Sequence, residues 1–292
     1  MSQLQELARR LTSAGYALHP EGTATYTLNT DDGSVVLMHW TGDSVGSEEL
    51  ITTSARAGST AAYIPTPDGG IVACITDSST VAVLHYDEDE EEWVEADGLP
   101  QCEVDPNGQL VACLDSTASV VVAFQNDAGD LICLQESDED ESWTTTEIQG
   151  ARKPAAGTPL SIRIDFDSLA LQVFYIAESD GAVHGATRLH GATLWEDTVV
   201  LPTGGSESLK RLLVMNGPNG AADYMAYALT SADNVVQLTA GEAVNDLGHV
   251  GKDGVLVPST TAECCMHIFG LVINLNFSLT LGVESKKRRF FR

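Results

Sequence analysis

Basic residues are scarce in this chain. Its 292 residues include 15 lysines and arginines against 42 aspartates and glutamates, which gives a formal net charge of −27. A surface field of that sign repels phosphate backbones and anionic lipids. We therefore expect neither a nucleic-acid partner nor a membrane surface, and the sequence leaves the oligomeric state open.

The chain also lacks the short motifs on which common catalytic sites are built. It contains no GxGxxG or P-loop, no HExxH and no CxxC pair. An ordinary hydrolase or oxidoreductase therefore has no recognisable residues here, and we expect no cofactor and no bound metal.

A secretory signal is missing as well. The segment from Met1 to Leu11 has no uninterrupted apolar core and no small-residue cleavage site. We expect a short amphipathic helix there and a cytoplasmic protein. The six cysteines fit free thiols, because four of them lie inside apolar, strand-like runs.

What the chain does contain is a repeat. A turn followed by a short β-type run recurs at positions 46, 50, 52 and 52 residues apart, which are Gly33, Ser79, Gly129, Gly181 and Asp233. Three of the units then carry a tryptophan, at Trp93, Trp143 and Trp195. Such a period, with several short strands in each unit, is typical of β-propeller blades, because one blade cannot bury both of its faces alone. We expect the three tryptophans to pack between blades.

Two of the units divide clearly into four strands. The predicted strands are 109–114, 119–125, 130–135 and 143–148 in the third unit, and 160–165, 171–177, 182–188 and 194–200 in the fourth. Three C-terminal runs, 254–258, 264–273 and the strictly alternating 274–283, could build a sixth blade. The prediction is an all-β, six-bladed propeller of four-stranded antiparallel blades, whose last blade is complete or shortened. It divides the chain into an N-terminal helix or arm (1–12), the propeller (13–283) and a basic disordered tail (284–292).

The repeat resembles the fungal fucose-specific lectins, which are six-bladed propellers. The resemblance is strongest in Val120-Val-Val-Ala-Phe-Gln-Asn-Asp-Ala-Gly-Asp-Leu-Ile-Cys133 with Trp143, and in Gln172-Val-Phe-Tyr-Ile-Ala-Glu-Ser-Asp-Gly-Ala-Val-His-Gly185 with Trp195. It implies an arginine at the start of the second strand and a glutamate at the end of the third, both of which bind the sugar while an aromatic ring stacks on it.

The positions that the resemblance assigns to this clamp hold other residues. The arginine positions are occupied by Thr25, Ile71, Val121 and Gln172. The glutamate positions are occupied by Leu37, Val83, Cys133, Gly185 and Gln237. Sugar hydroxyls would stay unpaired against such side chains, so we predict that no cleft between blades keeps a guanidinium together with a carboxylate.

A second group of proteins is similar in fold and lacks the sugar clamp: the fungal hetero-Diels–Alderases of tropolone sesquiterpenoid pathways. That resemblance implies a cofactor-free cyclase that joins a quinone methide to a terpene alkene, a reaction that needs two reactants held in register and no metal or nucleophile. This cyclase is the first hypothesis. The alternatives are a fucose- or glycan-binding lectin of altered specificity without catalysis, and a structural scaffold.

Each hypothesis of binding requires a small-molecule partner, and eight residues are candidates to contact it. They are Trp40, Gln125, Trp143, Gln172, Tyr175, His184, Trp195 and Gln237. Trp40 occupies a different place in its unit from the other tryptophans, which makes it the freest candidate. The glutamines have an equally good alternative role in hydrogen bonds to turn backbone, and His184 could bridge structural groups instead.

Overall fold

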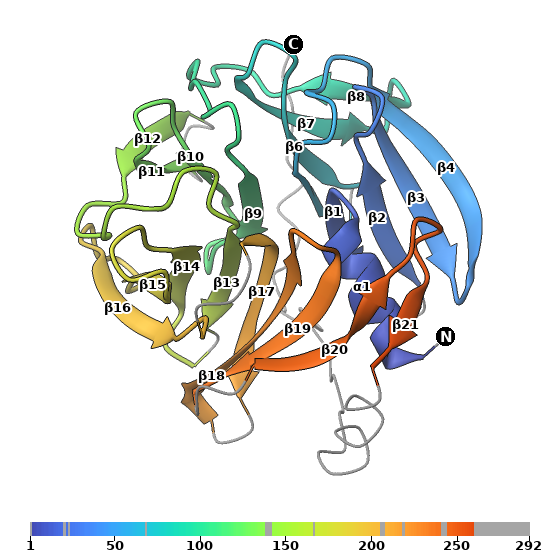
Figure 1. Cartoon of the computed structure of the whole chain (residues 1–292). Coiled ribbons are helices and arrows are strands. Elements are labelled where there is room, and N and C mark those ends of the chain that lie inside the picture. The colour runs from blue at the N-terminus through green and yellow to red at the C-terminus, as the bar shows by residue number, and fades with distance from the viewer. Residues whose placement is uncertain are drawn as a thin grey trace.

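Five β-sheets surround a common centre in the computed structural model (Figure 1). The structure describes residues 2–19, 22, 24–67, 69–137, 142–165, 167–204, 208–217, 220–240 and 244–259. Each sheet is antiparallel, and its strands follow one another in chain order from the inside of the ring outward. We call the sheets blades 1 to 5.

The helix and strands have the following bounds. Helix α1 spans Gln3–Thr12. Blade 1 consists of β1 (Gly15–Leu18), β2 (Thr25–Asn29), β3 (Val35–Thr41) and β4 (Ser44–Thr52). Blade 2 consists of β5 (Ala61–Ile64), β6 (Ile71–Ile75), β7 (Val81–Asp87) and β8 (Glu92–Glu95). Blade 3 consists of β9 (Leu110–Leu114), β10 (Val120–Gln125), β11 (Leu131–Glu136) and β12 (Trp143–Glu147). Blade 4 consists of β13 (Ser161–Asp165), β14 (Ala170–Ile176), β15 (Val183–Arg188) and β16 (Glu196–Leu201). Blade 5 consists of β17 (Leu209–Gly217), β18 (Gly220–Thr230), β19 (Asn234–Thr239), β20 (Val244–Val250) and β21 (Leu256–Pro258).

The repeated turn connects the second and third strand of every blade. All five turn residues have a left-handed backbone, with φ between 62° at Ser79 and Asp233 and 89° at Gly129. Glycine adopts this conformation without strain, and a short polar residue does so at modest cost, which explains the residue types at the repeat. The predicted strands of the third and fourth units agree with blades 3 and 4 to within two residues at each end.

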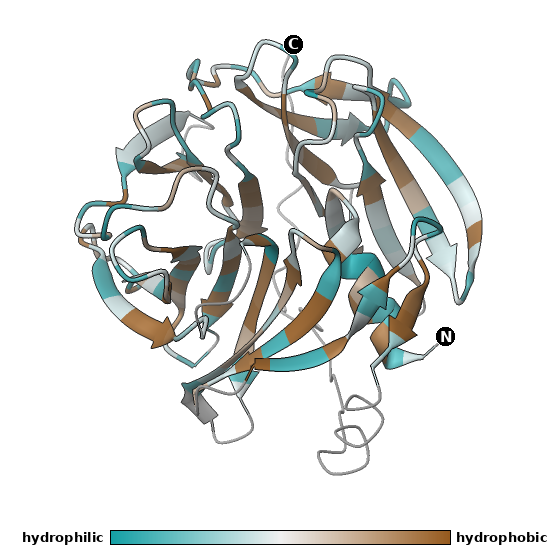
Figure 2. Ribbon diagram, in the orientation of Figure 1, coloured by the Kyte–Doolittle hydropathy of each residue, from teal (hydrophilic) through white to brown (hydrophobic). Residues whose placement is uncertain are grey.

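The core lies between the blades. Strand β10 shows the principle: Val120, Val122 and Phe124 pack against blade 2, whereas Val121 and Ala123 pack against blade 4. A middle strand covered on both faces has no polar side, which is why its sequence is a continuous apolar run. Hydrophobic residues accordingly concentrate in the strands of Figure 2 and hydrophilic ones in the loops.

The three repeated tryptophans occupy equivalent places in these interfaces. Trp93 packs on the cluster between blades 1 and 2, Trp143 on that between blades 2 and 3, and Trp195 on that between blades 3 and 4. Their predicted position between blades is confirmed.

Helix α1 lies between blade 5 and blade 1 (Figure 1). The Ser2 side chain accepts a hydrogen bond from the Gln5 N–H and caps the helix. The apolar side chains of α1 pack against Tyr227 and Leu247 of blade 5; they are Leu4, Leu7, Ala8 and Leu11. The Gln5 side chain also exchanges hydrogen bonds with the backbone of Gly254 (3.0 Å) and Leu256 (2.9 Å). The helix thereby covers a sheet face that would otherwise be open to water.

The described residues form five blades, so the prediction of a propeller is confirmed and the number six is not. The run 254–258, predicted as part of a sixth blade, instead contains β21, which pairs with β20 as the fifth strand of blade 5. The runs 264–273 and 274–283 and the basic tail lie outside the described residues.

Because α1 closes the ring, we predict that Leu7→Ala lowers the free energy of unfolding by about 2–4 kcal/mol, the range for a buried leucine replaced by alanine. Leu7 is only 4% exposed. Urea unfolding followed by tryptophan fluorescence measures the effect. Gln3→Ala, at an exposed position of the same helix, is the control, and equal stability of the two variants would contradict the closing role.

Candidate functional site

A polar cleft opens between blades 3 and 4. We call it the Arg188 cleft; its volume is about 390 Å³, and its lining includes Asp115, Gln135, Glu136, Leu169, Arg188 and His190. Asp115, Gln135 and Glu136 come from blade 3 or the turn after β9, and the other three come from blade 4. The cleft therefore exists only because two units of the repeat pack side by side.

Arg188 is the central cation of this cleft, and its position is fixed from two sides. It is the last residue of β15, and its Nη2 donates a hydrogen bond to Gln135 Oε1 (2.7 Å). Its guanidinium carbon lies 5.0 Å from the centre of the Trp195 ring, which is a cation–π distance. Of the five N–H groups of a guanidinium, the contacts within the described residues use one, so others can donate to a ligand.

The amide that holds Arg188 is itself anchored. Gln135 Nε2 donates to Asp115 Oδ2 (2.7 Å). The other Asp115 oxygen accepts hydrogen bonds from Thr117 N (2.8 Å) and Ser119 N (3.1 Å) in the turn after β9. This chain of carboxylate, amide and guanidinium is preorganised, because each member is already oriented before a ligand arrives.

The rim of the cleft adds hydroxyl, imidazole and apolar groups. Ser116 Oγ lies 2.8 Å from His190 Nδ1 across the two blades. Leu169 and Leu189, which are 43% and 56% exposed, form an apolar edge. Beneath the cleft, burial raises the pKa of the Cys133 thiol to about 11, so that it stays protonated near neutral pH. The arrangement suits reversible binding of a molecule that carries several hydroxyls, with an apolar face against the leucines.

Two carboxylates in this cleft contradict the sequence-based expectation. We predicted that no cleft between blades keeps a guanidinium together with a carboxylate, and this is wrong, because Asp115, Glu136 and Arg188 line the same cleft. The guanidinium comes from the end of a third strand instead of the start of a second strand. A comparison of equivalent strand positions therefore missed it. One sequence signal could have indicated this cation: Arg188 ends a strand-like run in a chain that has few basic residues.

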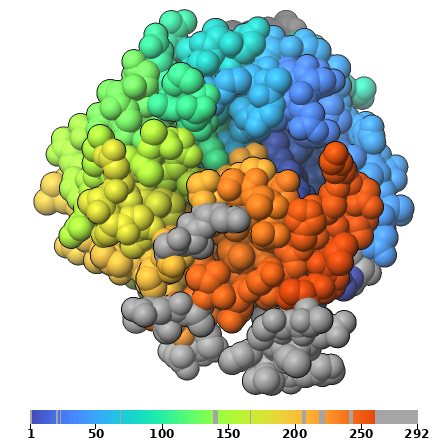
Figure 3. Space-filling view, viewed as in Figure 1, coloured from blue at the N-terminus to red at the C-terminus, as the bar shows by residue number. Residues whose placement is uncertain are grey.

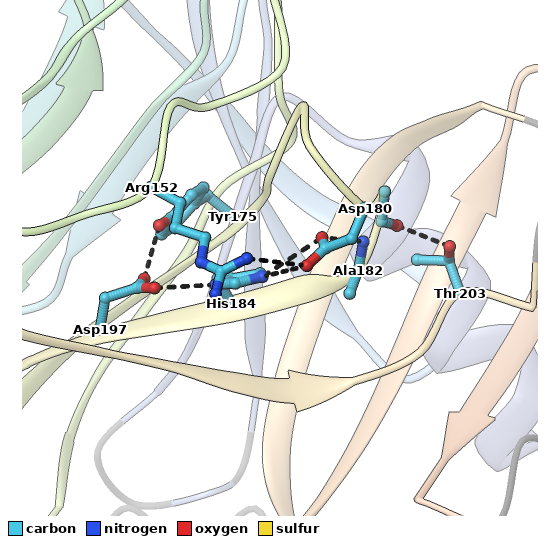
Figure 4. A network of polar contacts seen from close by, with 8 residues as sticks. Arg152, Tyr175, Asp180, Ala182, His184, Asp197 and Thr203 are labelled. Carbon is cyan, nitrogen blue, oxygen red and sulfur yellow. Dashed lines mark hydrogen bonds and ion pairs between the residues drawn. The ribbon is translucent and has the colours of Figure 1, made fainter.

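A second polar network lies inside blade 4 (Figure 4). His184 is fully buried, and its Nδ1 is 2.9 Å from Asp197 Oδ2 while its Nε2 is 3.2 Å from Asp180 Oδ2. The Tyr175 hydroxyl donates to the other oxygen of Asp197 (2.6 Å). Asp180 also contacts Arg152, so the network joins β14, β15 and β16 to the loop before the blade. All these groups are paired, which indicates a structural role for His184 and Tyr175.

The predicted glutamines also have partners within the protein. Gln125 is fully buried and links blade 3 to the loop that leads into blade 4. Its amide donates a hydrogen bond to Ala155 O (3.2 Å) and accepts one from Gly157 N (2.9 Å). Gln172 accepts from Arg163 Nε (2.7 Å) and donates to the Tyr224 hydroxyl (3.1 Å), at the junction of blades 4 and 5. Gln237 donates to Met225 Sδ (2.7 Å) in blade 5.

The eight candidate residues thus do not converge on one site. Tyr175 and His184 meet in blade 4, with ring centres 5.7 Å apart. Trp195 supports Arg188 and is 7% exposed, whereas Trp143 packs at the junction of blades 2 and 3. Trp40 lines a separate cavity between α1 and blade 1, where its Nε1 donates to Thr27 Oγ1 (2.9 Å). Whether any of the eight contacts a ligand stays a prediction.

Comparison with known proteins agrees on the fold. No family model matches the chain, and no curated protein matches its sequence. Among solved structures, the fucose-specific lectin of Aleuria aurantia superposes with a TM-score of 0.55 at 16% identity, covering 82% of this chain and 77% of the lectin. A lectin from Burkholderia pseudomallei superposes with a TM-score of 0.52 at 13% identity, covering 80% of this chain and 69% of that one. These similarities show that the chain has a β-propeller fold. No helix among the described residues is long and apolar enough to cross a membrane.

The hydrogen bonds of Asp180 in the blade 4 network predict how the stability of the protein depends on pH. The pKa of Asp180 is lowered from its ordinary value of 3.8, chiefly because the Ala182 N–H donates to the carboxylate and further through its hydrogen bond with His184. A carboxylate with a depressed pKa stabilises the fold above the unfolded pKa and loses this contribution as the pH falls through the folded one. We therefore predict that Asp180→Asn destabilises the protein near pH 7, and that the difference from the wild type shrinks below about pH 3.5.

Urea unfolding at the two pH values measures the difference. Asp127→Asn, at an exposed loop position, serves as the control and should give no such pH dependence. A difference for Asp180→Asn that is the same at both pH values would show that the ionised carboxylate is not what matters.

Proposed function

We propose that this protein is a carbohydrate-binding propeller, a lectin whose specificity differs from that of the fucose lectins, and that it binds glycans in the Arg188 cleft. The observation that carries the proposal is the anchored series of Asp115, Gln135 and Arg188 at the junction of two blades. Neighbouring sugar hydroxyls act as donors and acceptors at once, and a guanidinium beside an amide and carboxylates offers both kinds of partner.

The fold supports the proposal. The solved structures named above are lectins, and the Aleuria aurantia protein is described as fucose-specific. The residues at the equivalent clamp positions differ here, so the proposed ligand is a glycan held by a different set of groups. The leucines at the rim would cover an apolar face of a sugar ring, as buried apolar area does in other small-molecule sites.

The cyclase hypothesis receives less support from the cleft. A cycloaddition between two largely hydrocarbon reactants calls for an apolar cavity that aligns them. The Arg188 cleft instead presents charged, amide and hydroxyl groups to the ligand space. The cyclase stays a hypothesis that no described contact favours.

We predict that a glycan array with the full-length protein identifies at least one bound glycan, and that Arg188→Gln lowers the affinity for it at least about tenfold, the cost of losing one or two charge-assisted hydrogen bonds. Isothermal titration calorimetry measures the affinity. Asp115→Asn should weaken binding less, because it acts through Gln135.

The matched control is Arg152→Gln, an arginine whose side chain is 56% exposed and lies outside the cleft lining. It should bind like the wild type. No bound glycan on the array, or unchanged affinity for Arg188→Gln, would rule out the proposed function.

A further inference from the structure

A larger cavity lies on another part of the molecule, between α1, blade 1 and blade 5. We call it the channel-mouth hollow. It has a volume of about 540 Å³, and its lining includes Thr27, Trp40, Ser59, Arg211, Asp253 and Arg9. Figure 3 shows it as a recess between the blue residues of blade 1 and the orange to red residues of blade 5. Arg211 also lines the narrow central channel between the first strands of the blades.

Arg211 is a partly buried cation without a carboxylate partner among the described residues. Its one hydrogen bond runs from Nη1 to the backbone oxygen of Lys210 (3.3 Å), and its Nε is buried with no acceptor. Burial lowers the pKa of this arginine, and no neighbouring acid offsets the effect. A desolvated charge without a partner is costly to a folded protein.

Ser59 supplies a second unpartnered donor in the same lining. It is 7% exposed, and its hydroxyl has no hydrogen-bond partner among the described groups. Its backbone is nevertheless fixed, because Thr30 Oγ1 donates to the Ser59 carbonyl (2.7 Å). Buried polar groups in native proteins are normally satisfied, so two orphaned donors around one cavity indicate a ligand with acceptor atoms.

The other arginine of the hollow is already occupied. The Arg9 guanidinium carbon lies 3.7 Å from the centre of the Trp40 ring, and the group contacts Glu6 (3.5 Å) and Gly42 O (3.2 Å). Arg9 and Trp40 therefore form a rigid wall between α1 and β3. Arg211 is left as the cation that can take an anionic group of a ligand.

The remaining lining limits how much negative charge such a ligand can carry. Asp31, Asp43 and Asp253 border the hollow, and like charges would repel a phosphate ester or a polyanion. The same carboxylates, with the Asn29 amide, can accept hydrogen bonds from hydroxyl groups. Among the described lining residues, Arg211 is thus the cation without a carboxylate partner, and it lies in one cavity with several acceptors.

We propose that the channel-mouth hollow binds a small hydroxylated organic acid with a single carboxylate, of which a hexuronic acid is the representative. Its carboxylate pairs with Arg211 and accepts from Ser59, and its hydroxyls face the aspartates at the rim. This site is separate from the Arg188 cleft and does not depend on the proposed function.

Calorimetry with galacturonate and with neutral galactose as the matched ligand tests the proposal. The wild type should bind galacturonate at least about tenfold more tightly than galactose, and added salt should weaken the binding. Arg211→Met should abolish this preference while leaving the melting temperature unchanged or higher, because it removes a partly buried charge that has no carboxylate partner among the described residues. Ser59→Ala should weaken galacturonate binding severalfold and serves as the second variant.

Arg188→Gln distinguishes this site from the Arg188 cleft, since it should leave galacturonate binding intact. The proposal is overturned if galacturonate and galactose bind alike or not at all, or if Arg211→Met retains the preference. Loss of galacturonate binding in Arg188→Gln alone would place the acid in the other cleft and also overturn it.

Discussion

Every blade of this protein depends on its neighbours, because a four-stranded sheet with two apolar faces is stable only when both faces are covered. Strand β10 makes the constraint visible, since alternate side chains belong to the clusters on its two sides. The last face of the series is covered by a helix: α1 packs its leucines on blade 5, and its Arg9 reaches Trp40 of blade 1. Strand pairing within the units and apolar contacts between them together hold this fold.

The same constraint determines where polar cavities can form. Apolar side chains fill most of the space between blades, and the two polar cavities described above lie where the blades diverge or where the ring is closed by α1 instead of a blade. The Arg188 cleft is of the first kind and the channel-mouth hollow is of the second. Polar groups also meet at the junction of blades 4 and 5. There Arg163 donates a hydrogen bond to Gln172, and its guanidinium carbon lies 5.2 Å from the centre of the Tyr224 ring.

Local features were predictable from the sequence, and features that join distant units were not. The repeated turns need a left-handed backbone, which glycine and short polar residues adopt most readily, so the residue types alone indicate them. They lie at Gly33, Ser79, Gly129, Gly181 and Asp233. The strands of blades 3 and 4 follow from apolar runs of ordinary length. By contrast, Arg188 and Gln135 are 53 residues apart, and only the packing of two blades brings them together. Position in the repeat did not reveal burial, because His184 and Gln125, near the expected sugar positions, are fully buried and hydrogen-bonded within the protein. Whether they contact a ligand stays a prediction.

The central claim is that a preorganised guanidinium at the junction of two blades recognises a polyhydroxylated ligand. A crystal structure of the protein with a glycan bound tests it most directly. The account predicts sugar between blades 3 and 4, with two hydroxyls within hydrogen-bond distance of Arg188 and with Gln135 still bonded to that arginine. A sugar bound elsewhere on the ring, with the Arg188 cleft filled by water alone, would contradict it.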